Sequence, residues 1–227
     1  MRSVSVVRTR PTTARPDPVA PWRLGTPAVT VRRWGRPLAT GRFAVLDVET
    51  TGLVPDTDRV IEVAVVTTDR QGQVTDEWSV LVDPGRDPGP TDVHGITTRD
   101  LAGAAGFAGH VHELAERLHG AVLVAHNLAF DAAFLRAEGR RIPDRAGSVL
   151  DGVTATLCTL DVSRQVLARP ANGWSLASLC ASTDVPLVGA HRALTDARAT
   201  AGLLAVLLGQ FPLDRRGLLH RRLTARR

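Results

Sequence analysis

Short runs of hydrophobic residues in the first half of the chain predict a series of strands. The runs FAVLDV (43–48), RVIEVAVVTTD (59–69) and QVTDEWSVLV (73–82) have the length and the β-branched content of buried strands. A Gln-Gly pair supplies a tight turn between the second and third runs, so we expect a three-stranded antiparallel meander. A fourth apolar run, AVLVAHN (121–127), predicts a strand that leads directly into a helix.

Apolar residues at helical spacing predict helices in the rest of the chain. The helix expected at 128–139 places Phe130 and Phe134 one turn apart, on the face that would meet the core. The other expected helices are one that begins near Arg99 with Thr97 or Thr98 as its cap, and those at 110–120, 156–168, 175–182 and 193–208. The order of elements predicts an α/β fold, in which helices flank a mixed sheet of three antiparallel strands followed by parallel strands.

Charge divides the chain into three parts. Residues 1–42 form an Arg- and Pro-rich arm with a net charge of +8, residues 43–209 form the predicted domain with −8, and residues 210–227 form a basic tail with +5. The chain has Arg but no Lys, a preference that genome base composition can explain, but base composition does not separate charge by sign. We expect the acidic domain to bind cations and the basic arms to bind a polyanion.

Composition argues against several classes of protein. The only two cysteines, Cys158 and Cys180, form no CxxC pair, which argues against a disulfide framework and against a zinc ribbon. No apolar stretch approaches the roughly 18 residues that a membrane span needs, and the N-terminus lacks the apolar core of a secretory signal. We therefore expect a cytoplasmic protein with no membrane partner.

The first predicted strand carries two acids, Asp47 and Glu49, at its end. Side chains at i and i+2 of a strand point to the same face, so these two carboxylates should converge. Burying a carboxylate without a partner costs several kcal/mol. Either the strand runs out into solvent at this point, or a cation compensates the two charges.

Two later helices also carry acids near their starts. Asp131 lies in the first turn of the helix that follows the fourth strand, and His191 precedes Asp196 by five residues in HRALTDA. Five residues rotate by about 140° on a regular helix, so the two side chains cannot share one face. We expect His191 on the loop before the helix and Asp196 inside it.

Four carboxylates gathered in one place would need a cation to offset their repulsion. Oxygen-only ligands favour Mg²⁺ or Mn²⁺ over zinc. Two such ions can stabilise both the attacking and the leaving oxygen when a phosphodiester is cleaved. A histidine beside them has a reference pKa of about 6.5, which suits it to accept a proton from the attacking water. The pattern therefore predicts metal-assisted hydrolysis of a phosphodiester.

The three segments that hold these residues, DVETTGL, AHNLAFD and HRALTDA, resemble in order and spacing the three motifs of the DEDDh 3′→5′ exonucleases. That family includes the epsilon proofreading subunit of bacterial DNA polymerase III. The resemblance covers residues 43 to about 208 and implies a ribonuclease H-like fold. It also implies that His191 is the general base and that two Mg²⁺ or Mn²⁺ ions, both bridged by Asp47, are bound by Asp47, Glu49, Asp131 and Asp196.

The neighbours of the first two motifs predict how a substrate is held. The residues expected to bind it are Thr50, Thr51, Gly52, Leu53, His126 and Asn127. The first three follow the acidic strand end, where exposed backbone N–H groups can hold the terminal nucleotide, and Leu53 can wedge against the last base. The alternative for this stretch is a plain turn. The His-Asn pair is expected to cap the next helix and to order the pocket rather than to bind metal.

We expect a metal-dependent 3′→5′ exonuclease that releases nucleoside 5′-monophosphates from single-stranded or frayed DNA 3′ ends. A DNA polymerase is a candidate partner, in proofreading or in repair. One alternative is an exoribonuclease of the same chemistry acting on short or structured RNA, although Thr50 favours the DNA branch of the family. Another is a noncatalytic nucleic-acid-binding or polymerase-associated subunit, in which the Arg-rich arms bind the nucleic acid.

Overall fold

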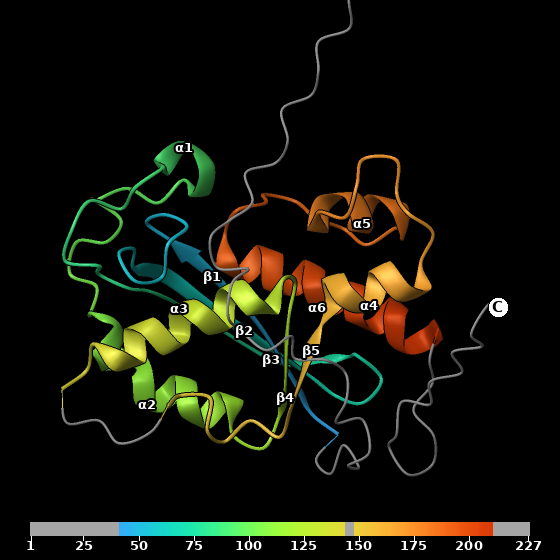
Figure 1. Cartoon of the computed structure of the whole chain (residues 1–227), viewed down its shortest axis with the longest axis horizontal. Coiled ribbons are helices and arrows are strands. Elements are labelled where there is room, and N and C mark those ends of the chain that lie inside the picture. The colour runs from blue at the N-terminus through green and yellow to red at the C-terminus, as the bar shows by residue number, and fades with distance from the viewer. Residues whose placement is uncertain (1–40, 144–147, 211–227) are drawn as a thin grey trace, which may run out of the picture.

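The computed structural model describes residues 41–143 and 148–210 (Figure 1). Residues 1–40 and 211–227, which make up nearly all of the predicted arm and tail, lie outside the described residues. The described chain contains a five-stranded sheet with the order β3-β2-β1-β4-β5. The strands are β1 (Phe43–Thr50), β2 (Val60–Thr68), β3 (Val74–Leu81), β4 (Val122–Ala125) and β5 (Ala155–Cys158).

The strand directions confirm the predicted mixed sheet. β1 pairs with β2 and β2 with β3 in antiparallel ladders, whereas β1 pairs with β4 and β4 with β5 in parallel. The helices are α1 (Thr91–His94), α2 (Phe107–Leu118), α3 (Leu128–Arg140), α4 (Thr159–Val166), α5 (Leu176–Ser182) and α6 (Ala193–Gln210). β1 thus lies in the middle of the sheet, between its antiparallel and its parallel parts.

Alternate residues of β1 face opposite layers of helices. Leu46 and Val48 belong to the core that α2 and α3 cover, whereas Val45 belongs to the core under α6. Figure 1 shows α2 and α3 on one side of the sheet and α6 on the other. Because side chains two residues apart share a face of a strand, Asp47 and Glu49 lie on the α6 side.

α6 is buried along two faces, which fixes its position on the sheet. Four of its residues recur at helical spacing and pack on the strands: Ala193, Ala197, Ala201 and Leu204. A second stripe, with Leu203 and Leu207, packs with Leu179 of α5. Burying one leucine side chain contributes about 1.5–3 kcal/mol. The first turn of α6 is therefore held firmly at the end of β1.

The predicted helix at 156–168 is wrong over its first residues. Residues 155–158 form β5, which pairs in parallel with β4, and α4 begins only at Thr159. Four residues are too few to show the alternation of a half-buried strand, and the apolar residues of β5 run on directly into those of α4. The exposed ladder edge of β4 supplies the partner that makes this short strand form.

The predicted helix near Arg99 is also wrong. Residues 98–103 form turns, and the Asp100 carboxylate accepts hydrogen bonds from the backbone N–H and the hydroxyl of Thr97. The Ser, Thr, Asn and Asp side chains that cap helices stabilise isolated turns through the same bonds. The Thr97 hydroxyl oxygen also accepts a hydrogen bond from the Asp100 N–H at 3.3 Å, as a helix cap does, but no helix follows.

The expected pairing of two phenylalanines on α3 is confirmed. Phe130 and Phe134 lie one turn apart with ring centres separated by 4.8 Å, and Phe134 is completely buried. Both cysteines are free thiols. Among the described residues, no helix combines the length and the apolar character that crossing a membrane requires.

Candidate active site

The structure brings three of the predicted acids together at the end of β1. Asp47 and Glu49 point to the side of α6, and Asp196 lies in the first turn of α6. One carboxylate oxygen from each of them lies within 4.8 Å of the other two. Oxygens that share one Mg²⁺ ion lie at most about 4.2 Å apart, since each bond is about 2.1 Å long. The three oxygens are thus nearly close enough to share an ion.

Asp131 approaches the same place from the opposite helix layer. It lies in the first turn of α3, and only 3% of its surface is exposed. It is not one of the three grouped oxygens, but among neighbouring charges it raises the pKa of Asp47 the most. The four predicted acids therefore gather as a group of three, with the fourth beside Asp47.

Burial and mutual repulsion raise the pKa values of these acids. Burial raises the pKa of Asp47 well above its usual range, and repulsion from Asp131 and Glu49 adds to the rise. Burial and neighbouring acids raise the pKa of Glu49 to about 7, although Arg192 opposes the rise. Burial raises the pKa of Asp131 to about 8, against hydrogen bonds donated by backbone N–H groups. The carboxyls therefore hold protons more tightly than usual, and a cation bound among them would have to displace those protons.

The two oxygens of Asp196 have different surroundings. Oδ2 accepts a hydrogen bond from the backbone N–H of His191 at 3.1 Å. Oδ1 is buried and has no hydrogen-bond partner among the described residues. A buried carboxylate oxygen without a partner is costly, and a cation held with Asp47 and Glu49 would supply the missing interaction. The residues present therefore fit a divalent metal ion.

His191 lies just before α6 begins, as its spacing from Asp196 predicts. Its side chain is exposed, and its backbone adopts the left-handed conformation with φ of 68°. That conformation costs a non-glycine residue roughly 1–2 kcal/mol, which the hydrogen bond to Asp196 helps to offset. The loop thus holds the imidazole at the edge of the acids, open to solvent.

The region that contains these residues matches a known family. Residues 44–204 match the family described as Exonuclease (RNase_T). The chain belongs to the exonuclease family. This confirms the enzyme class and the family resemblance that the three motifs predict.

Known proteins similar to this exonuclease domain include a polymerase and two separate exonucleases. The domain is 33% identical over 161 residues to a PolC-type DNA polymerase III of Thermotoga petrophila, a match that covers 70% of this chain and 11% of that protein. A structure of exonuclease X in complex with 5′-overhanging duplex DNA is similar with a TM-score of 0.55 and 25% identity, over 74% of this chain and 91% of that one. A structure of exonuclease I shares the fold with a TM-score of 0.66 and 20% identity, and the match covers 75% of this chain and 41% of that one. The chain spans about a ninth of the length of the curated relative.

The loop after β1 presents its backbone differently from the prediction. The N–H of Thr51 donates to the carbonyl of the residue before β2 at 2.9 Å, and the Thr50 hydroxyl donates to the carbonyl of Gly52 at 2.6 Å. A Cβ atom on Gly52 would lie 2.5 Å from the Asp58 carboxylate, so a larger residue here would displace that carboxylate from its hydrogen bond with the Val54 N–H. The prediction that the Thr51 N–H holds a nucleotide is therefore wrong, because that donor is already used. Leu53 is 63% exposed and free to contact a substrate.

His126 and Asn127 lie where β4 leads into α3. The ring nitrogens of His126 lie 3.0 Å from the Thr159 hydroxyl and 3.2 Å from the Trp174 carbonyl oxygen, so the ring ties β4 to the segments around α4 and α5. Asn127 occupies the N-cap position of α3 with φ of 69°, but its side chain makes no capping hydrogen bond. The prediction that Asn127 occupies the cap position is confirmed, but the side-chain hydrogen bond of a cap is not formed. Asn tolerates this left-handed conformation better than most residues.

Sequence reasoning missed Glu62, which lies beside Glu49 in the register of β1 and β2. Glu62 is 2% exposed in a strand that is buried along its whole length. Its carboxylate accepts hydrogen bonds from Arg192 and from the backbone N–H of Ala193, at the start of α6. The signal in the sequence was an acid in the middle of the apolar run RVIEVAVV.

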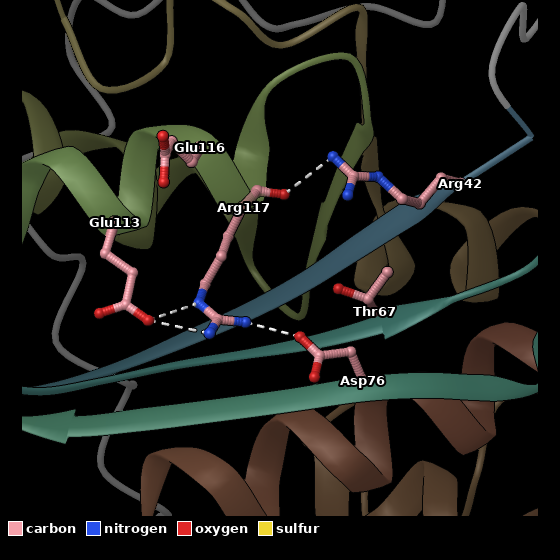
Figure 2. Close-up of a pocket in the computed structure, with 6 residues that line it drawn as sticks. All are labelled: Arg42, Thr67, Asp76, Glu113, Glu116 and Arg117. Carbon is pink, nitrogen blue, oxygen red and sulfur yellow. Dashed lines mark hydrogen bonds and ion pairs between the residues drawn. The ribbon is translucent and has the colours of Figure 1, made fainter.

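A pocket of about 270 Å³ lies at the start of β1, at the opposite end from the acids (Figure 2). It is lined by Arg42, Thr67, Asp76, Glu113, Glu116 and Arg117. Figure 2 shows Arg117 reaching between two acids, to which it donates at 2.6 Å (Asp76) and 2.9 Å (Glu113). Because these charges compensate one another, we assign this pocket no part in the chemistry.

Proposed function

We propose that this domain is a metal-dependent 3′→5′ exonuclease that hydrolyses the terminal phosphodiester of DNA and releases nucleoside 5′-monophosphates. The observation that carries the proposal is the group of carboxylates at the end of β1, within the region that matches the exonuclease family. Acids that repel one another at this distance are stable together when a cation neutralises them. The three segments that supply them are those that resemble the DEDDh motifs.

The proposed cofactor is a pair of Mg²⁺ or Mn²⁺ ions. Asp47, Glu49 and Asp196 would hold one ion, and Asp131 beside Asp47 would help to hold the second. The hard carboxylate oxygens favour these metals, and Oδ1 of Asp196, which has no hydrogen-bond partner in the described part of the chain, supports the assignment. When bound, such ions stabilise the charge that develops on the attacking and leaving oxygens.

His191 is the proposed general base. Its exposed ring can reach a water at the edge of the acids and accept a proton from it. The hydrogen bond from its backbone to Asp196 holds the loop and so directs the ring. The proposed role of His191 is therefore to take the proton of the attacking water.

DNA is the proposed substrate, in the form of single-stranded or frayed 3′ ends. A PolC-type DNA polymerase III is among the similar proteins, and the exonuclease X structure contains duplex DNA. Leu53 is proposed to pack against the terminal base, with Thr50 and Gly52 shaping the loop beneath it. A DNA polymerase is the proposed partner.

The test is digestion of a 5′-labelled DNA oligonucleotide and a matched RNA in Mg²⁺ or Mn²⁺. We expect products that shorten from the 3′ end on DNA, and none with a chelator. Asp47→Asn should lower the rate by at least about 10²-fold, as loss of one transition-state contact does. Asp76→Asn is the matched control, because Asp76 is an exposed acid at the other end of the sheet. It should keep the rate within about twofold of the parent.

The alternatives give different results in the same assay. Preferential digestion of RNA would assign the exoribonuclease activity. Salt-sensitive DNA binding that persists without metal and without any digestion would assign a noncatalytic subunit. Equal rates for the parent and Asp47→Asn would contradict the proposed site.

A further inference from the structure

We propose that Glu62 is a positioning residue that fixes the start of α6, and through it Asp196 and His191, relative to the acids of β1. The inference rests on the proposed function, because what Glu62 positions is the metal-binding group. Glu62 itself is not among the grouped ligands. Its carboxylate lies on β2 next to Glu49, and its partners are Ser79 on β3, Arg192, and Ala193 at the start of α6.

Both oxygens of Glu62 are fully used. Oε2 accepts from Nε of Arg192 at 3.1 Å and from the backbone N–H of Ala193 at 3.0 Å. Oε1 accepts from Nη2 of Arg192 at 3.1 Å and from the hydroxyl of Ser79 at 3.3 Å. A guanidinium bound through two nitrogens fixes orientation as well as distance. The Ala193 N–H is one of the donors that the first turn of a helix leaves without an internal partner.

Burying the Glu62 carboxylate costs free energy, which argues that the arrangement serves a geometric purpose. Glu62 is 2% exposed, whereas the Arg192 side chain is 51% exposed. A buried ion pair contributes little net stability compared with apolar residues of similar volume. The pair does, however, define one position and one orientation for the segment that it joins.

Glu62 binds the segment that lies between His191 and Asp196. Arg192 directly follows His191. Ala193 is the first residue of α6, and Asp196 lies three residues later in the same first turn. Asp196 in turn accepts the His191 N–H with one oxygen, and its other oxygen has no hydrogen-bond partner within residues 41–143 and 148–210. Releasing Glu62 would therefore let this other oxygen of Asp196 move away from the acids of β1.

A second ion pair between the sheet and α6 offers a matched control. Glu77 on β3 accepts from Nε and Nη2 of Arg198, two residues after Asp196. Its chemistry is the same, but the side chains are 32% and 53% exposed. Exposed pairs of this kind contribute little to stability or position.

The experiment measures Mn²⁺ binding to the full chain by titration calorimetry, for the parent, Glu62→Gln and Glu77→Gln. We expect Glu62→Gln to weaken Mn²⁺ binding about 10- to 100-fold, the range found when partners of metal ligands are lost. Glu77→Gln should stay within about twofold of the parent. Circular dichroism confirms that each variant is folded.

Arg192→Lys tests the same contact from its exposed side and keeps the charge. An ammonium group cannot form the two-nitrogen fork, so Mn²⁺ binding should weaken several-fold. This variant decides the question if Glu62→Gln does not fold. Mn²⁺ affinity within about twofold of the parent in the folded variants would overturn the inference. So would an equal loss in Glu77→Gln.

The outcome for the positioning role can be separated from that for the nuclease. If the parent binds Mn²⁺ and Glu62→Gln weakens the binding, but the parent cleaves neither DNA nor RNA, the positioning role is supported and the proposed function is contradicted. A parent chain that binds no Mn²⁺ overturns both.

Discussion

Acidic side chains gather at both ends of β1, but the protein neutralises only one of the two groups. At the start of the strand, Arg117 donates to Asp76 and Glu113, and its guanidinium lies 5.1 Å from the centre of the Trp78 ring. At the other end, three carboxylate oxygens lie within 4.8 Å of one another, and the nearby arginine is bound to Glu62 instead. The number of acids is therefore a poor sign of a metal site, and the lack of compensating charge is a better one.

The largest expected difference between the two ends is their response to metal. Mn²⁺ at about 100 times its dissociation constant should raise the free energy of unfolding by about 2.7 kcal/mol, because it binds only the folded chain. Thermal unfolding with and without Mn²⁺ measures this. Asp196→Asn should abolish the stabilisation, and Asp76→Asn should preserve it. Stabilisation that survives in Asp196→Asn would place the ion elsewhere.

The second difference concerns pH. Glu49 and Asp131 have pKa values of about 7 and about 8 in the folded domain, above their ordinary values of 4.5 and 3.8. The folded state therefore binds their protons more tightly, so their stabilising contribution is complete below about pH 4 and is lost as pH rises through about 7 to 8. For the metal-free protein we expect the free energy of unfolding to fall by several kcal/mol between about pH 5 and pH 8, at about 1.4 kcal/mol per pH unit for each group that stays protonated only in the folded state.

Urea unfolding of the metal-free protein across that pH range measures the loss. Glu49→Gln should flatten the pH dependence, since glutamine carries no proton to release. Glu113→Gln, at the compensated end, should leave the slope of the parent. A stability that rises with pH over this range would contradict the raised pKa values.

The smallest expected effect is at the compensated end itself. Arg117→Met should lower the free energy of unfolding by about 1 kcal/mol, because it removes surface ion pairs and a cation–π contact. Nuclease rate and Mn²⁺ affinity should not change. If either fell together with stability, the two ends of β1 would be coupled, and the contrast between them would fail.

The parts of the fold that repeat a pattern could be predicted from the sequence. The alternation of side chains along a strand is enough to place Asp47 and Glu49 on one face of β1. β5 could not be predicted in this way, because a four-residue strand forms only when the edge of β4 is beside it. The prediction of a helix near Arg99 failed because capping side chains are present there, but too little packing follows them to propagate a helix.

The candidate site shows the same division. The three motifs indicated which acids would meet, because each motif lies at the end of a strand or the start of a helix. The contact between Glu62 and Arg192 joins residues 130 positions apart, and spacing along the chain carries no signal for it. The use of the Thr51 N–H within its own loop was equally invisible, since it depends on how that loop folds back on β2.

The shared use of Asp196 has a consequence for how substitutions combine. One of its oxygens holds the turn that carries His191, so removing this carboxylate loses a ligand and releases the base in a single step. Effects of substitutions at positions 191 and 196 should therefore overlap rather than add. A rate measured after changing either residue alone describes the behaviour of the pair.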